Sequence, residues 1–130
     1  MRLTILLISL LSSVCFVDAQ NVIQLDTLSS SDKNIHVTEL ATDSNSTSYY
    51  IIIKKEVSPH IHQWHSESIF IIEGKAQMMM NDSTFQIKKG DFIYIPPQTK
   101  HAVKVSSKTP LKVLSIQAPK FEGKDRIFLD

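Results

Sequence analysis

The sequence is nearly without cysteine: Cys15 is the only one among 130 residues. An intramolecular disulfide is therefore excluded, although small exported domains commonly rely on disulfides for stability. If the N-terminal segment that carries Cys15 is removed, the remaining chain has no thiol at all. Such a chain must be held together by the packing of its side chains, with or without a bound metal ion.

Arginine is almost as rare, because Arg126 is the only arginine after Arg2. A clamp of several arginines around a phosphate or a dicarboxylate is therefore excluded, although lysines could still bind anions as point charges. An excess of charge is missing too, since 14 basic and 13 acidic residues leave a formal net charge of +1. This balance indicates no surface for nucleic acid or for an anionic membrane, so we expect neither partner.

A long apolar run is also missing. Residues 3–17 are largely apolar, but they are fewer than the roughly 20 residues that a membrane helix needs. Arg2 precedes this run and Ala19 ends it in a cleavage-like position, so the sequence predicts a signal peptide over residues 1–19. A retained membrane anchor and a lipoprotein site at Cys15 are the alternatives. We therefore expect a single secreted or periplasmic domain over residues 20–130, with no membrane association after cleavage.

The expected domain is almost entirely β-structure. No window shows a sustained helical period, and turn residues separate short runs rich in β-branched and aromatic residues. Many short strands at close spacing predict a sandwich or a small barrel. The expected strands cover residues 35–39, 49–57, 67–72, 76–80, 84–87, 92–95, 102–105 and 111–116.

Residues with metal-ligand chemistry precede one of these strands. His60 and His62 are two positions apart, so on a strand both side chains point to the same face. Glu67 follows at an odd offset of five, and a bend or bulge between them must reset the alternation. Glu67, Ile69 and Ile71 then share one face of the strand.

A carboxylate at the start of a buried face is costly unless it is paired or bound to a cation. A divalent metal ion held by His60, His62 and Glu67 would remove that cost. One more ligand should come from elsewhere in the chain, and His101 is the only histidine downstream. It follows a rigid double-proline turn and precedes the face that carries Val103.

The spacing of these residues resembles the two sequence motifs of the cupin family. The first motif contains His-x-His, then Glu after three or four residues, then Gly after six more. The second contains Gly, then Pro after five residues, then a histidine. The matching residues are His60, His62, Glu67 and Gly74 within residues 54–74, and Gly90, Pro96 and His101 within residues 90–105. Fifteen residues separate Gly74 from Gly90, as in the compact single-domain cupins of bacteria.

Three positions depart from the family pattern. Lys54 and Gln98 stand where the motifs have glycine, and Val105 stands where the second motif has asparagine. None of the three is a ligand position in the family. The departures therefore concern loop geometry and subfamily rather than metal binding.

The resemblance implies a jelly-roll cupin β-barrel with one divalent metal ion per chain, held by His60, His62, Glu67 and His101. Fe, Mn, Zn, Ni and Cu all suit imidazole and carboxylate ligands, and the sequence does not choose among them. It also implies a metal-dependent enzyme of the dioxygenase, isomerase or lyase type, acting on a small polar organic molecule. The alternative is a non-catalytic secreted or periplasmic module that binds a metal or a small ligand.

Two further residues are candidate catalytic groups. His65 could act as an acid or base at the rim of the cavity, and a spare ligand or a solvated loop histidine are its alternatives. Tyr94 could donate a proton or a hydrogen bond inside the cavity, but its neighbour Ile95 competes for the inward face. A homodimer is also expected, because strands near Ile35 and Tyr49 are candidate sheet edges.

Overall fold

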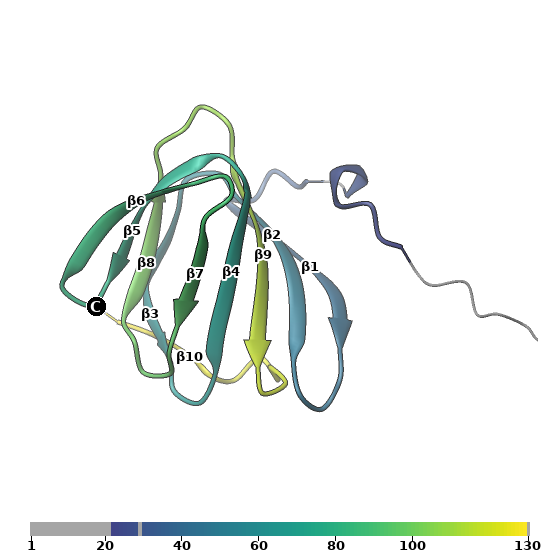
Figure 1. Ribbon diagram of the computed structural model, residues 1–130, viewed down its shortest axis with the longest axis vertical. Helices are drawn as coiled ribbons and strands as arrows, with labels where there is room; N and C mark the ends of the chain where they lie inside the picture. The colour runs from purple at the N-terminus through teal and green to yellow at the C-terminus, as the bar shows by residue number, and fades with distance from the viewer. Residues whose placement is uncertain (1–21, 29, 130) are drawn as a thin grey trace, which may run out of the picture.

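The computed structural model describes residues 22–28 and 30–129 (Figure 1). The expected signal peptide at residues 1–19 lies outside the described residues. One short 3-10 helix, Leu25–Thr27 (η1), precedes the strands, and no described helix is long and apolar enough to cross a membrane. The strands are Ile35–Thr42 (β1), Thr47–Ile53 (β2), Glu56–His62 (β3), Ser66–Glu73 (β4), Lys75–Met80 (β5), Ser83–Lys88 (β6), Phe92–Ile95 (β7), His101–Val105 (β8), Leu111–Ala118 (β9) and Arg126–Phe128 (β10).

The strands form two five-stranded antiparallel sheets. One sheet has the order β1-β2-β9-β4-β7 and the other has the order β10-β3-β8-β5-β6. From β3 onward, most consecutive strands lie in different sheets, so the chain winds back and forth around a common interior (Figure 1). This arrangement confirms the predicted all-β jelly-roll barrel.

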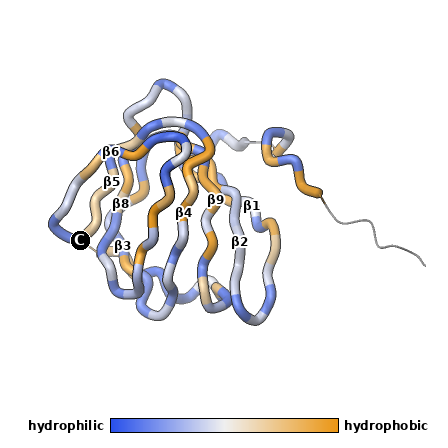
Figure 2. The backbone as a smooth tube through the Cα atoms, viewed as in Figure 1, coloured by the Kyte–Doolittle hydropathy of each residue, from blue (hydrophilic) through white to orange (hydrophobic). Residues whose placement is uncertain are grey.

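The core lies between the two sheets because the strands alternate apolar inward positions with exposed ones. On β9, Leu111 and Val113 point inward and are almost fully buried. On β4, Ile71 is fully buried while its neighbour Phe70 is exposed. Figure 2 shows the hydrophobic residues concentrated along strands such as β4 and β9, with hydrophilic residues in many of the connecting loops. The interior is therefore packed by side chains from both sheets.

Gly74 allows β4 to turn directly into β5. Its φ of +89° lies in the left-handed region, and a Cβ at this position would stand 2.6 Å from the carbonyl oxygen of Pro110. A side chain cannot be accommodated against backbone at that distance. The glycine that closes the first sequence motif is therefore required by the turn itself.

One strand prediction is corrected by the structure. Residues 49–57 do not form one strand, because the exposed Lys54 and Lys55 turn the chain between β2 and β3. Pro59 lies within β3, at a place where the β3–β8 pairing shifts register. Proline is tolerated at such a bulge because the ladder lacks a regular hydrogen bond there.

The bend expected between His62 and Glu67 is present. The chain leaves β3 at His62, bends at residues 63–64, and enters the other sheet at Ser66. The strand order places β1 at a sheet edge, whereas β2, which carries Tyr49, lies between β1 and β9. Tyr49 therefore does not mark an edge, and self-association through β1 stays a prediction.

Candidate metal centre

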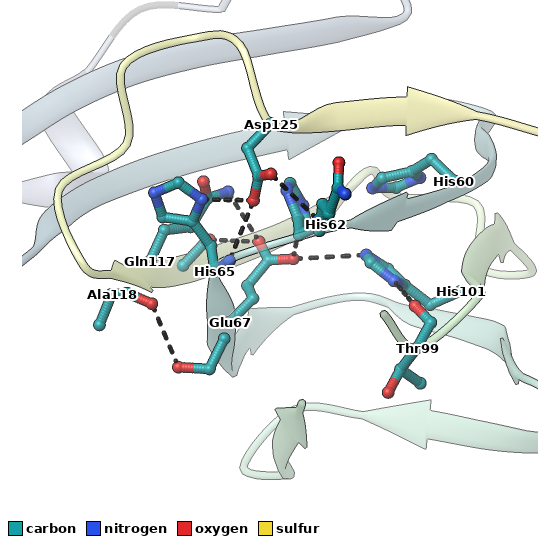
Figure 3. Close-up of polar contacts among 12 residues, drawn as sticks. His60, His62, His65, Glu67, Thr99, His101, Gln117, Ala118 and Asp125 are labelled. Atoms are coloured by element: carbon teal, nitrogen blue, oxygen red, sulfur yellow. Dashed lines mark hydrogen bonds and ion pairs between the residues drawn. The ribbon is translucent and has the colours of Figure 1, made fainter. Parts of the chain in front are cut away.

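Three buried histidines come together in the barrel interior (Figure 3). His60 and His62 share the inward face of β3 and are 3% and 2% exposed. His101 begins β8, which pairs with β3 so that His60 and His101 stand opposite each other. One ring nitrogen from each of the three lies within 4.8 Å of the other two. The predicted meeting of His101 with the histidine pair is confirmed, although 41 positions separate His60 from His101.

Backbone carbonyl groups fix the orientation of two of these rings. The Nδ1 atom of His60 lies 2.8 Å from the carbonyl oxygen of Ser58, and the Nδ1 atom of His101 lies 2.9 Å from that of Thr99. Because a carbonyl oxygen only accepts hydrogen bonds, Nδ1 must carry the proton in both rings. A ring that is protonated at Nδ1 alone presents a free lone pair at Nε2, as a metal ligand requires.

Several buried nitrogens of this cluster lack a hydrogen-bond partner among the described residues. They are Nδ1 and Nε2 of His62 and Nε2 of His101. Buried polar atoms are nearly always hydrogen-bonded, so a group of unpaired ring nitrogens facing one another calls for a common partner. A metal ion accepts lone pairs from several nitrogens at once.

Glu67 brings a carboxylate to the same place. It begins the inward face of β4, and its Oε2 atom lies 3.7 Å from Nε2 of His62 and 3.5 Å from Nε2 of His101. Its other oxygen, Oε1, accepts hydrogen bonds from the hydroxyl of Ser115 and from the amide of Gln117. One oxygen is thus held by β9 while the other faces the histidines.

The electrostatics keep this cluster in the charge state that a metal site needs. Burial is the main cause that lowers the pKa of His60 and His62, each to about 4, so both rings are neutral near pH 7. Burial opposes ionisation of Glu67, but the neighbouring His101 ring and the hydrogen bond from the Ser115 hydroxyl outweigh it and lower the pKa of this carboxyl to about 2. His60 and His62 therefore offer neutral imidazoles, and Glu67 offers a carboxylate.

These four residues fit a divalent transition metal. Imidazole nitrogen and carboxylate oxygen suit Zn, Fe, Mn, Ni and Cu alike, and four protein ligands leave positions open on a metal that accepts five or six. The fit rests on the unpaired nitrogens and on the carboxylate oxygen beside them. Glu67 and the three histidines are the residues that would hold the ion.

A cavity opens from this cluster into the barrel. Its volume is about 70 Å³, and His60, Glu67 and His101 line one part of it. Most of the remaining wall is aliphatic, with side chains contributed by both sheets. A small organic molecule could therefore reach the histidine cluster through an apolar chamber.

His65 is neither a solvated loop residue nor a free group at the rim. It is 7% exposed, its Nδ1 atom is hydrogen-bonded to Asp125, and its Nε2 atom lies 2.9 Å from the carbonyl oxygen of Lys120. Burial lowers the pKa of the ring, but the hydrogen bonds to Lys120 and Asp125 outweigh this and raise it above its usual value. Both ring nitrogens are hydrogen-bonded within the protein, so neither is free to act as the acid or base expected from the sequence.

Tyr94 lies outside the cavity. β7 alternates buried Ile93 and Ile95 with exposed Phe92 and Tyr94, and the Tyr94 side chain is 54% exposed. Ile95 therefore takes the inward position for which the two residues compete. The expectation that Tyr94 donates a proton inside the cavity is wrong, because strand alternation directs its hydroxyl to the outer face.

Three polar residues that support the site were not singled out from the sequence. Ser115 and Gln117 continue the inward face of β9 after Leu111 and Val113, and polar residues at the end of such a face were the available signal. Asp125 lies 60 positions from His65, in a segment without a sequence motif. Its carboxylate accepts hydrogen bonds from the backbone of residues 63–65 as well as from the His65 ring.

Comparison with known proteins gives a family match. The family model described as Cupin domain, Cupin_2, matches residues 49–117, which is more than half of the chain. An uncharacterized protein of Methanocaldococcus jannaschii is 37% identical over 71 residues, a match that covers 55% of this chain and 57% of that protein. Quercetin 2,3-dioxygenase of Bacillus subtilis is 26% identical over 74 residues, covering 52% of this chain and 22% of the enzyme. The chain thus matches less than two thirds of the length of either protein.

Solved structures share the fold. A conserved protein of Klebsiella pneumoniae with a double-stranded β-helix domain superposes with a TM-score of 0.73. The two chains are 18% identical, and the superposition covers 86% of this chain and 99% of the other. At this level of identity the likeness concerns the course of the chain around the barrel.

Proposed function

The chain belongs to the cupin family, and from this premise we propose that it binds one divalent metal ion and is a metal-dependent enzyme acting on a small organic molecule. The reaction types we consider are those of a dioxygenase, an isomerase or a lyase. The match to quercetin 2,3-dioxygenase supports the first of these, over the part of that enzyme that the chain covers.

One observation carries the proposal: three buried histidine nitrogens converge within 4.8 Å, and a carboxylate oxygen lies beside two of them. In a metal-free protein this arrangement is unfavourable, because two of these nitrogens, on His62 and His101, have no hydrogen-bond partner among the described residues. A bound dication would compensate for their burial. The same ion would balance the charge of Glu67, which is 5% exposed.

The protein residues around the ion would perform positioning. The carbonyl groups of Ser58 and Thr99 hold His60 and His101 in the required tautomer, and Ser115 orients the Glu67 carboxylate. The aliphatic wall of the cavity excludes bulk water and strengthens electrostatic interactions within it. A metal bound here would supply a Lewis acid or a site for oxygen activation.

A specific observation also favours a second candidate, a non-catalytic binding module. Among the described residues that line the cavity, the polar ones are the three metal-ligand candidates His60, Glu67 and His101, together with Arg126. His65 is engaged by Asp125, and Tyr94 is outside the cavity. A cavity without a separate acid or base is suited to retaining a ligand as much as to converting it.

The test is metal analysis of the purified protein, followed by a substrate screen with the native metal restored. We expect about one equivalent of a transition metal, loss of this metal on dialysis against a chelator, and retention of metal by the control variant His36→Ala. His36 lies on β1 and does not line the cavity. Protein that neither carries nor takes up a divalent metal would contradict the metal-dependent enzyme, whereas metal binding without turnover would favour the binding module.

The cellular location belongs to the same proposal. The N-terminal sequence supports export through a signal peptide over residues 1–19, giving a secreted or periplasmic domain. Such a domain would meet metal ions and small molecules outside the cytoplasm. Its lack of cysteine after cleavage would leave packing and the metal to stabilise it.

A further inference from the structure

Arg126 extends a single cation into the metal-centre cavity. It begins β10, where its backbone pairs with that of His62 on β3. Directly paired residues of neighbouring strands project to the same face of a sheet, so Arg126 points to the inward side that His62 occupies. The guanidinium side chain accordingly lines the same cavity as His60, Glu67 and His101.

The guanidinium group lacks a protein partner within the described residues. Its Nε atom is buried without a hydrogen bond, and no described carboxylate forms an ion pair with it. Elsewhere in the described chain, Lys112 pairs with Glu73 at 2.7 Å. A half-buried cation with an unpaired donor is unfavourable unless a ligand supplies an acceptor.

The charge balance of the cavity also calls for an anion. Arg126 pairs with His62 and lines the same cavity as His60 and Glu67, so its positive charge adds to that of the site. With a dication bound, Glu67 would neutralise one of three positive charges, which leaves the site attractive to an anionic group.

The rest of the cavity wall indicates that the anion should have an apolar body. Twelve of the sixteen lining residues are aliphatic or methionine, including Ile51, Ile69 and Val113. Contact with such a wall removes the apolar surface of a ligand from water, which favours binding. The wall offers no polar groups that could recognise a sugar or a phosphate away from the histidine cluster.

We propose that the ligand of this cavity is a small monocarboxylate with an apolar body, whose carboxylate is bound by the guanidinium group of Arg126. Planar guanidinium groups bind carboxylates through two parallel hydrogen bonds, and one unpaired arginine suits one carboxylate. The apolar body then packs against the aliphatic wall. This inference rests on the proposed function for the role of the metal and names the substrate class of the same site.

The test is calorimetric titration with three probes of matched chemistry. 4-Methylpentanoate carries both features, 4-methylpentanamide keeps the body without the charge, and acetate keeps the charge without the body. We expect 4-methylpentanoate to bind at least roughly tenfold more tightly than the amide, because hydrogen bonds to charged groups are the stronger ones. It should exceed acetate by at least about tenfold because of its apolar surface.

Variants then assign the preference to one residue. Arg126→Gln should abolish the preference for carboxylate over amide, Arg126→Lys should retain part of it, and Lys124→Gln should leave it unchanged. Lys124 is an exposed cation in the same segment and does not line the cavity. Retained metal binding by Arg126→Gln would show that this variant is folded.

The proposal is overturned if the parent binds the acid and the amide equally, if no probe binds at millimolar concentration, or if Arg126→Gln keeps the parent's preference. The titrations are run with the metal-loaded protein and with chelator-treated protein. A carboxylate preference that persists in protein unable to take up metal would refute the metal function while supporting the role of Arg126. Metal binding without a carboxylate preference would support the metal function and refute the role of Arg126.

Discussion

At the residue scale, spacing identified the side chains that meet in the interior but not the partners that orient them. His60 and His62 had to share a face because strand alternation has a period of two, and the structure places both inward. The same rule could not decide between Tyr94 and Ile95, because alternation alone does not show which of two adjacent residues faces the core. His65 could not be interpreted either, because its partner Asp125 is distant in sequence and marked by no motif.

The lowered histidine pKa values predict how the metal-free protein responds to acid. His60 and His62 have a pKa of about 4 in the folded state against 6.5 in a model peptide, so the unfolded chain binds more protons between these values. The free energy of unfolding should therefore fall as the pH falls from about 6.5 to about 4. Urea unfolding across this range, with a chelator present, measures the effect.

A variant with both histidines changed to glutamine gives the control for this titration. Its unfolding free energy should depend less steeply on pH over the same window, because two proton-binding differences are removed. His65 has a raised pKa and acts in the opposite direction, but it is present in both proteins and cancels in the comparison. Parallel pH profiles for the parent and the double variant would show that the two rings are not the buried neutral groups described above.

At the scale of strands and turns, alternation predicted most of the elements, whereas the remaining ones depend on tertiary pairing. The strands from β4 to β9 coincide closely with the expected runs because each is a short apolar stretch bounded by turn residues. The split between β2 and β3 was missed because an apolar run continues up to Lys54 and resumes at Val57. β10 has three residues and forms because it pairs with β3. No local sequence pattern predicts this pairing.

Gln98 shows where a departure from the family pattern has a structural consequence. It stands in the place of a family glycine, and its φ of +63° lies in the left-handed region. A side chain in this region costs roughly 1–2 kcal/mol relative to glycine. We therefore predict that Gln98→Gly raises the free energy of unfolding by about 1 kcal/mol, and that Gln98→Val lowers it. Urea denaturation decides the signs, and a destabilised glycine variant would contradict this reading of the turn.

Asp125 ties the C-terminal segment to the bend between β3 and β4. Its two oxygens accept hydrogen bonds from the backbone of Gln63, Trp64 and His65, and the carboxylate is 5% exposed. Asp125→Ala would leave buried donors unpaired, so we predict that it lowers the free energy of unfolding by about 3 kcal/mol. The exposed neighbour Glu122 gives the matched control, since Glu122→Ala should change stability by less than about 0.5 kcal/mol. Equal effects of the two substitutions in urea denaturation would show that the Asp125 carboxylate does not tie the C-terminal segment to the bend between β3 and β4.

At the scale of the whole molecule, the sequence predicted a barrel and a shared site but not the character of its chamber. The barrel followed from many short strands, and the meeting of His101 with His60 followed from the resemblance to cupins. The aliphatic lining of the cavity and the place of Arg126 within it follow from how the two sheets close, with β10 paired to β3. Composition shows only that arginine is rare, whereas the position of Arg126 in the cavity is known from the structure.

Export gives a prediction for the chain as a whole. If residues 1–19 are a signal peptide, the protein isolated from its native host should begin at Gln20. Intact-mass spectrometry of that protein measures the N-terminus directly. A cytoplasmic product that retains Met1 would contradict export, and a membrane-bound product that retains it would favour the anchor alternative.

The central claim is that His60, His62, Glu67 and His101 hold one divalent ion, and calorimetric titration of Glu67→Gln with Mn(II) or Zn(II) tests it most directly. The substitution keeps the shape of the side chain and removes the only negative charge among the four ligands. Affinity should fall by roughly a hundredfold or more relative to the parent, since even outer partners of metal ligands cost about 10- to 100-fold. Glu56→Gln, which changes an exposed glutamate at the start of β3, should bind as the parent does. A Glu67→Gln variant that binds the metal as tightly as the parent would contradict the claim.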